Sequence, residues 1–139
     1  APNVSIKNLP DHFIVTQENH HEILSVADAA IVSSGTATLE TAILGCPMVV
    51  CYKLSPITWF LAQKMSSVKY LSLVNIIGNK NIVKELLQAD MNAPNIADEV
   101  LFLLSGDGQK SIKADYETLR NSLIFKTNPY KEAAQYILA

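Results

Sequence analysis

Apolar runs of strand length alternate with segments of helical periodicity along much of the chain. Ala29–Val32 and Met48–Tyr52 carry apolar side chains without interruption, a pattern typical of parallel strands that are covered on both faces. Shorter apolar runs at Phe13–Val15 and Tyr70–Leu73 predict two further strands. We therefore expect a sheet of about four strands, fewer than a typical nucleotide-binding half-domain contains.

The segments between and after these runs predict helices. Thr36–Leu44 is the clearest, because Gly45 stops it and Pro47 follows, which is a common helix ending. A further predicted helix is capped by Asn19 or His20 and ends near Val26. The others run over Pro56–Met65, Ile82–Gln88, Ala93–Leu104 after Asn92, Gly108–Leu123 and Tyr130–Leu138. Strands that alternate with helices favour right-handed βαβ units, so the predicted fold class is α/β with a doubly wound parallel sheet.

Ligands of such sheets bind outside the carboxyl ends of the strands. This singles out the loops at Ser33–Thr36, Tyr52–Pro56 and Val74–Lys80. We expect residues 1–106 to form the α/β domain and residues 107–139 to form a helical extension. The small number of strands, and a start at Ala1 without an initiator Met, lead us to expect that at least one βα unit is missing upstream.

Composition narrows the classes of protein that the chain can represent. Apolar residues make up 49% of it and charged residues 17%, so the chain can bury a core. The net charge is −2 and no cluster of Lys and Arg marks one face, which argues against a nucleic-acid site. No apolar run reaches the ~18 residues of a membrane span. Cys46 and Cys51 lack zinc-site spacing, and we expect two small core residues in a reducing compartment.

The strongest chemical signal joins a buried strand to a helix at residues 33–40. Ser34 and Thr36 are able to cap this helix, and Gly35 allows a ligand to approach the backbone closely. The first N–H groups and the positive end of the helix dipole would then form a diphosphate site. Glu40 lies one turn after Thr36 on the same face, where its carboxylate can accept hydrogen bonds from ribose hydroxyls. The alternative is an ordinary capped helix with an exposed glutamate.

Five sequence blocks carry a family resemblance. They are Ser34–Glu40 (Ser-Gly-Thr-Ala-Thr-Leu-Glu), Pro47–Val50, Tyr52–Pro56, Tyr70–Asn75 and Val83–Gln88. In this order and at this spacing they resemble the lipid-A-disaccharide synthase family. The resemblance covers residues 27–88, whereas the helical tail is similar only in character.

The resemblance implies a GT-B fold, in which two Rossmann-like domains enclose the active site, and this chain is similar to the carboxyl-terminal, UDP-sugar-binding domain. By matching positions, Ser34, Gly35 and Thr36 would contact the diphosphate and Glu40 the ribose. Asn75 and Gln88 match donor-side positions, Lys53 stands where the family usually has Arg, and Lys80 lies in a further donor-side loop.

The chain also departs from the family pattern. Val74 replaces the Pro expected before Asn75, which leaves that loop less fixed. Gly78–Asn81 replaces a block like Ala-Gly-Arg-Glu, and Lys80 keeps the charge without the planar fork of arginine. A glycine-rich Pro-Gly-Ser-Arg block and the amino-terminal acceptor domain are absent from this sequence.

The implied reaction transfers 2,3-diacylglucosamine from UDP to 2,3-diacylglucosamine 1-phosphate, with inversion at the anomeric carbon. The catalytic base is expected in the missing domain, so this chain alone is expected to be inactive. No Asp-x-Asp is present, and we predict no metal or other cofactor. The resemblance also implies a cytoplasmic enzyme that associates peripherally with the inner membrane, and it is compatible with a homodimer.

Other interpretations stay open at this point. The domain is also compatible with another GT-B UDP-sugar enzyme, either a transferase or an epimerase, or with a non-enzymatic interaction module. The amphipathic stretch Pro56–Met65 either packs on the sheet or faces acyl chains or a membrane. His12, His20 and His21 are expected at a helix start or on the surface, because adjacent helical side chains project about 100° apart and do not easily share a metal.

Overall fold

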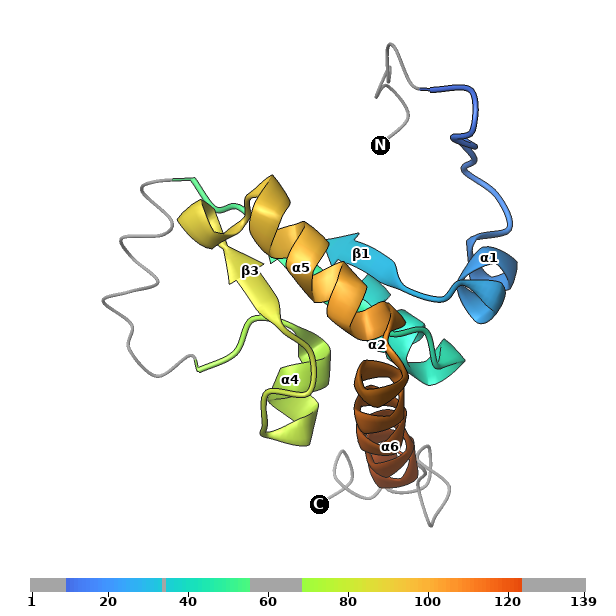
Figure 1. Ribbon diagram of the computed structural model, residues 1–139. Coiled ribbons are helices and arrows are strands. Elements are labelled where there is room, and N and C mark those ends of the chain that lie inside the picture. Colours follow the sequence, from blue (N-terminus) through green and yellow to red (C-terminus); the bar gives the residue numbers. More distant parts are fainter. Residues whose placement is uncertain (1–9, 34, 56–68, 124–139) are drawn as a thin grey trace, which may run out of the picture.

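The computed structural model describes residues 10–33, 35–55 and 69–123. Three parallel strands form an open sheet in the order β1 (Ala30–Ser33), β2 (Met48–Tyr52) and β3 (Glu85–Leu87) (Figure 1). The register pairs Ala30 with Met48 across the first two strands and Val50 with Glu85 across the second pair. The described part of the chain thus has a parallel α/β sheet, as the sequence predicts.

Helices surround this sheet. They are α1 (His20–Val26), α2 (Thr36–Leu44), α4 (Leu73–Gly78), the 3-10 turn η1 (Gln88–Asp90), α5 (Ala93–Leu104) and α6 (Gly106–Leu123). Helix α2 connects β1 to β2 and contacts α4 and α6, whereas α5 crosses the front of the strands in Figure 1. None of these described helices is long and apolar enough to cross a lipid bilayer.

The core forms around the central strand. Met48, Val49 and Val50 are fully buried, which confirms that β2 is covered on both faces. Helix α6 contributes Ile112, Tyr116 and Leu119 to the same cluster. The tail from residue 106 to residue 123 therefore packs on the α/β core. The expected division of the chain after residue 106 stays a prediction.

The ends of α2 and α5 follow the sequence prediction. At Gly45, φ is 84°, and the N–H groups of Gly45 and Cys46 donate to the carbonyls of Ala42 and Thr41 over 3.1 Å each. This is the Schellman arrangement, which favours glycine because of the positive φ. Asn92 opens α5 by accepting a 3.0 Å hydrogen bond from the N–H of Asn95.

Three predicted elements are wrong. Tyr70–Leu73 is not a strand, because Ser72 caps α4 by accepting a hydrogen bond from the N–H of Asn75. The segment 82–88 contains β3 instead of a helix. Phe13–Val15 is not a strand, and it is exposed and has no ladder partner among the described residues. Short apolar runs do not distinguish helix from strand by periodicity, so tertiary contacts decide the outcome.

The remaining predicted helices are confirmed where the structure describes them. Helix α1 and helix α5 have the expected bounds, and α6 begins at Gly106, two residues before the expected start. Gly108 lies so close to the carbonyl of Phe102 that a Cβ atom has no room there, which lets α6 turn tightly after α5. The predicted helices Pro56–Met65 and Tyr130–Leu138 lie outside the described residues.

A buried polar network fixes α4 against the start of β3. The Asn75 side chain is fully buried and donates to the carbonyl of Val83 and to the Glu85 carboxylate, both over 2.8 Å. Its oxygen accepts from the N–H groups of Ile82 (2.8 Å) and Val83 (2.9 Å). The Glu85 carboxylate also accepts from the N–H and hydroxyl of Ser72. The side-chain polar groups of Asn75 are thus satisfied within the fold.

Replacing Asn75 with alanine should destabilise the domain strongly. Asn75→Ala removes the acceptor of two backbone N–H groups and the donor to the Val83 carbonyl, so we expect a loss of about 3 kcal/mol in the free energy of unfolding. Urea unfolding monitored by circular dichroism measures this loss. Asn121→Ala, at an exposed position on α6, is the control and should change stability by less than about 0.5 kcal/mol. Equal stabilities of the two variants would contradict a structural role for Asn75.

Candidate functional site

The strand register aligns the carboxyl ends of all three described strands. Ser33 pairs with Cys51, and Tyr52 pairs with Leu87. The chain leaves the strands after Ser33, Tyr52 and Leu87, so the segments that follow the three described strands share one edge of the sheet (Figure 1). This is the edge at which parallel α/β sheets bind ligands.

The start of α2 is shaped by a glycine. Gly35 is the N-cap residue, with φ 129° and ψ −160°, a conformation that L side chains rarely adopt. Its carbonyl accepts from the N–H of Thr38 (3.2 Å) and from the Thr38 hydroxyl (2.8 Å). Because Thr38 is fully buried, these bonds tie the turn to the core.

The expected cap by the Thr36 side chain is wrong. Thr36 is the first residue of α2, and no described side chain accepts a capping hydrogen bond at this helix start. Gly35, Thr36 and Ala37 are exposed. The positive end of α2 therefore faces outward, as an anion site requires. Ser34, the other expected cap and site residue, lies outside the described residues.

Glu40 borders a pocket of about 350 Å³ beside β1. Ser33 and Ala37 line this pocket with Glu40, and α1 supplies His20 and Ile23 on the other side. The volume falls within the range of small-ligand sites. The Glu40 side chain is 47% exposed, so its carboxylate can accept hydrogen bonds from hydroxyl groups of a bound ligand.

Gln88 connects two of the carboxyl-edge loops. Its side-chain oxygen accepts from the N–H of Leu54 (3.0 Å), and its side-chain nitrogen donates to the carbonyl of Leu54 (3.3 Å). The neighbouring Lys53 is exposed at the end of β2. Gln88 thus fixes the backbone beside Lys53, and the donor-side role that the resemblance implies for Gln88 stays a prediction.

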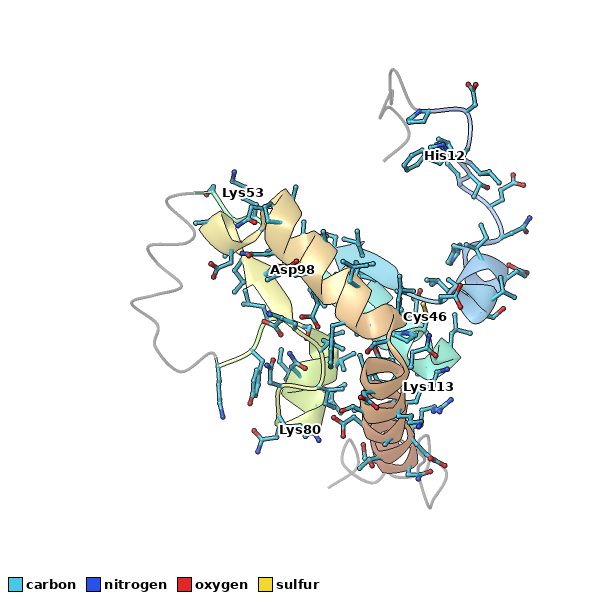
Figure 2. The ribbon with its side chains drawn as sticks, in the orientation of Figure 1. His12, Cys46, Lys53, Lys80, Asp98 and Lys113 are labelled. Atoms are coloured by element: carbon cyan, nitrogen blue, oxygen red, sulfur yellow. The ribbon has the colours of Figure 1, made fainter. Side chains whose placement is uncertain are left out.

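Asn75 and Lys80 lie at the opposite end of the sheet. Asn75 binds the residues that lead into β3, and the Lys80 ammonium forms a 2.7 Å ion pair with Asp115 of α6. Figure 2 shows Lys53 and Lys80 at opposite ends of the sheet. The structure therefore brings the start of α2, Lys53 and Gln88 to one edge, with Glu40 one turn along α2 from that edge. It keeps Asn75 and Lys80 away from this edge.

A cluster of two histidines and Glu40 escaped the sequence analysis. The rings of His20 and His21 have centroids 4.1 Å apart, and Nε2 of His21 lies 3.6 Å from Oε2 of Glu40. The expected helix-start and surface positions of His20 and His21 are confirmed, but the two rings lie closer together than the expected divergence of adjacent helical side chains implies. Their proximity to Glu40 arises from the packing of α1 against α2, which spacing in the sequence does not reveal.

The other titratable groups with altered environments are structural. Burial raises the pKa of the Cys46 and Cys51 thiols, and Asp28 adds to the effect at Cys46. Burial also raises the pKa of the Tyr116 phenol far above its ordinary range, with a further contribution from Cys46. Both thiols stay protonated at neutral pH and are poor nucleophiles, which agrees with the expected core role of the cysteines.

Taken together, the parallel sheet, the helices around it and the exposed start of α2 define a Rossmann-like α/β half-domain with a helical tail. A sequence profile described as lipid-A-disaccharide synthetase matches residues 3–138. The chain belongs to this family.

Curated relatives agree with the family. Lipid-A-disaccharide synthase of Sulfurihydrogenibium sp. (strain YO3AOP1) is 43% identical over 87% of this chain and 30% of the relative. The enzyme of Syntrophus aciditrophicus is 41% identical over 74% of the chain and 27% of the relative. That of Blochmanniella pennsylvanica is 32% identical over 90% of the chain and 32% of the relative. The chain thus spans about a third of the length of these relatives.

Removing the Gln88 side chain should loosen the loop that carries Lys53. In Gln88→Ala the Leu54 N–H loses its acceptor, so we expect it to exchange with solvent about fivefold faster, corresponding to about 1 kcal/mol. Amide hydrogen exchange followed by NMR measures this rate. Gln88→Glu keeps an acceptor for the Leu54 N–H and should retain most of the protection. Unchanged exchange in Gln88→Ala would show that the loop is held by other contacts.

Proposed function

We propose that this chain is the donor-binding part of a glycosyltransferase of lipid A biosynthesis. The observation that carries the proposal is the exposed start of α2 with Glu40 one turn along the helix. An anion at the helix start and a ribose above Glu40 are separated by about one helical turn, which matches the order of diphosphate and ribose in a UDP-sugar. Membership of the family supports a sugar nucleotide as the ligand.

In the proposed complex, different residues contact different parts of the UDP-sugar donor. Backbone N–H groups at Gly35 and Thr36 bind the diphosphate, and the sequence match to the family adds Ser34 to this proposed contact. Glu40 accepts hydrogen bonds from the ribose hydroxyls. Lys53 adds a positive charge at the same edge, and Gln88 holds the loop of Lys53 in place. Asn75 and Lys80 would contribute only through the fold, since they lie at the other edge.

The proposed reaction forms the lipid A disaccharide. The sugar of UDP-2,3-diacylglucosamine would pass to 2,3-diacylglucosamine 1-phosphate with inversion, and the departing UDP needs stabilisation of its developing charge. The start of α2 and Lys53 are suited to this stabilisation. A general base must also remove the proton of the acceptor hydroxyl, and we place it in another part of the full-length protein. We further propose that no metal is required and that the full-length enzyme is cytoplasmic, acts peripherally at the inner membrane and forms a dimer.

The donor site is tested by titrating the chain with UDP in a calorimeter. We expect binding in the micromolar to millimolar range, weakened about tenfold by Glu40→Ala, which corresponds to about 1.4 kcal/mol. Glu117→Ala removes the same charge from an exposed position on α6 and should leave UDP affinity unchanged. An equal loss of UDP affinity in the two variants would show that only the net charge of the chain matters, and it would contradict a contact between Glu40 and the ribose. No UDP binding to the folded chain would contradict donor binding by this chain alone.

An activity assay tests whether the catalytic base lies outside this chain. We expect the purified chain to form no disaccharide from UDP-2,3-diacylglucosamine and 2,3-diacylglucosamine 1-phosphate, because it supplies no base for the acceptor. A full-length relative serves as the positive control, with product followed by thin-layer chromatography of radiolabelled lipid. Disaccharide synthesis by the chain itself would place the base within these 139 residues.

A further inference from the structure

We propose that His20, His21 and Glu40 form a binding site for a divalent transition-metal ion such as Zn²⁺. Each residue offers one ligand atom, and these three atoms lie within 4.8 Å of one another. Two imidazoles and one carboxylate are a donor set that zinc and related ions prefer. Exposed acidic groups alone do not select such ions, whereas two neighbouring imidazoles do.

The two helices hold the ligands near the required geometry. Zinc binds these atoms at about 2.0–2.2 Å, so ligand atoms around one ion lie no more than about 4.4 Å apart. All three side chains are exposed, and small rotations about their side-chain bonds bring the atoms within that limit. Solvent can supply the remaining ligands of the ion.

The backbone fixes the positions from which these side chains project. Asn19 has a left-handed conformation (φ 59°), and its carbonyl accepts from the N–H of Ile23 over 3.0 Å, which starts α1 at His20. Helix α1 packs against α2, which carries Glu40. The two imidazoles and the carboxylate therefore come from two packed helices and do not depend on a loop.

A metal at this position has a consequence that rests on the proposed function. A carboxylate that coordinates a cation has fewer lone pairs for ribose hydroxyls, and the ion would sit on the rim of the same 350 Å³ pocket. Metal binding and nucleotide binding should therefore oppose each other, and each lowers the affinity of the other by the same factor. The metal would act as an inhibitor and take no part in the transfer.

The site itself is tested by titrating the chain with Zn²⁺ in the absence of nucleotide. We expect one equivalent of Zn²⁺ to bind. His20→Ala, His21→Ala and Glu40→Gln should each weaken the affinity about tenfold or more. His12→Ala is the matched control, because His12 is exposed on the segment before α1 and stacks on Phe13, and it should change nothing. Figure 2 shows His12 at a distance from α1.

Co²⁺ as a spectroscopic substitute identifies the ligands. Absorption bands of nitrogen and oxygen coordination are expected, and a strong thiolate band would assign the metal to cysteine and overturn the proposal. Absence of Zn²⁺ binding, or an equal loss in His12→Ala, would overturn it as well.

The opposition to nucleotide is measured separately, by UDP titration with and without saturating Zn²⁺. We expect Zn²⁺ to lower the UDP affinity of the wild-type chain about tenfold. His21→Ala holds the ion more weakly and should, at the same Zn²⁺ concentration, lose clearly less UDP affinity than the wild-type chain. This variant also controls for Zn²⁺ bound by UDP itself. Zn²⁺ binding without any effect on UDP would refute the shared use of Glu40. Failure to bind UDP in the absence of metal would instead refute the donor site.

Discussion

The arrangement of the candidate site depends on the buried hydrogen bonds of Asn75 and Glu85. These bonds hold α4 against the chain that leads into β3 and so determine where β3 begins. The start of β3 in turn places Gln88 at the carboxyl edge, where its side chain binds both backbone groups of Leu54. A polar network at one end of the sheet thereby positions Lys53 at the other end, because the rigid ladder between β2 and β3 connects them.

The two ends of helix α2 differ in how their backbone hydrogen-bonding groups are satisfied, and this difference makes the start of the helix the proposed anion site. Its last carbonyls are satisfied by the turn at Gly45 and Cys46, whereas its first turn has no described side-chain cap. An unsatisfied helix start costs stability in isolation and becomes favourable when an anion binds there. The bonds from Thr38 to the Gly35 carbonyl keep this start in one conformation, so a ligand meets a preorganised group of donors.

Glu40 is the point at which two kinds of ligand would meet. Its side chain lines the pocket beside β1 together with His20, and its carboxylate lies 3.6 Å from Nε2 of His21. Hydroxyl donors and metal cations both bind to the oxygen lone pairs of Glu40, and one carboxylate cannot bind both at full strength. The packing of α1 on α2 thus links the proposed donor site to the proposed metal site without any change in fold.

The sequence by itself determined the parallel α/β class, strand β2, helices α1, α2 and α5, and the family, because buried strands, glycine stops and ordered motif blocks are local signals. The segment 70–88 was predicted wrongly, since its helix and strand are selected by Ser72, Asn75 and Glu85 acting across the fold. The same holds for the site. Gly35, Thr36 and Glu40 were proposed as site residues from their spacing in the sequence. The structural role of Asn75, the contact of Gln88 with Leu54 and the approach of His20 and His21 to Glu40 exist only once separate elements pack together.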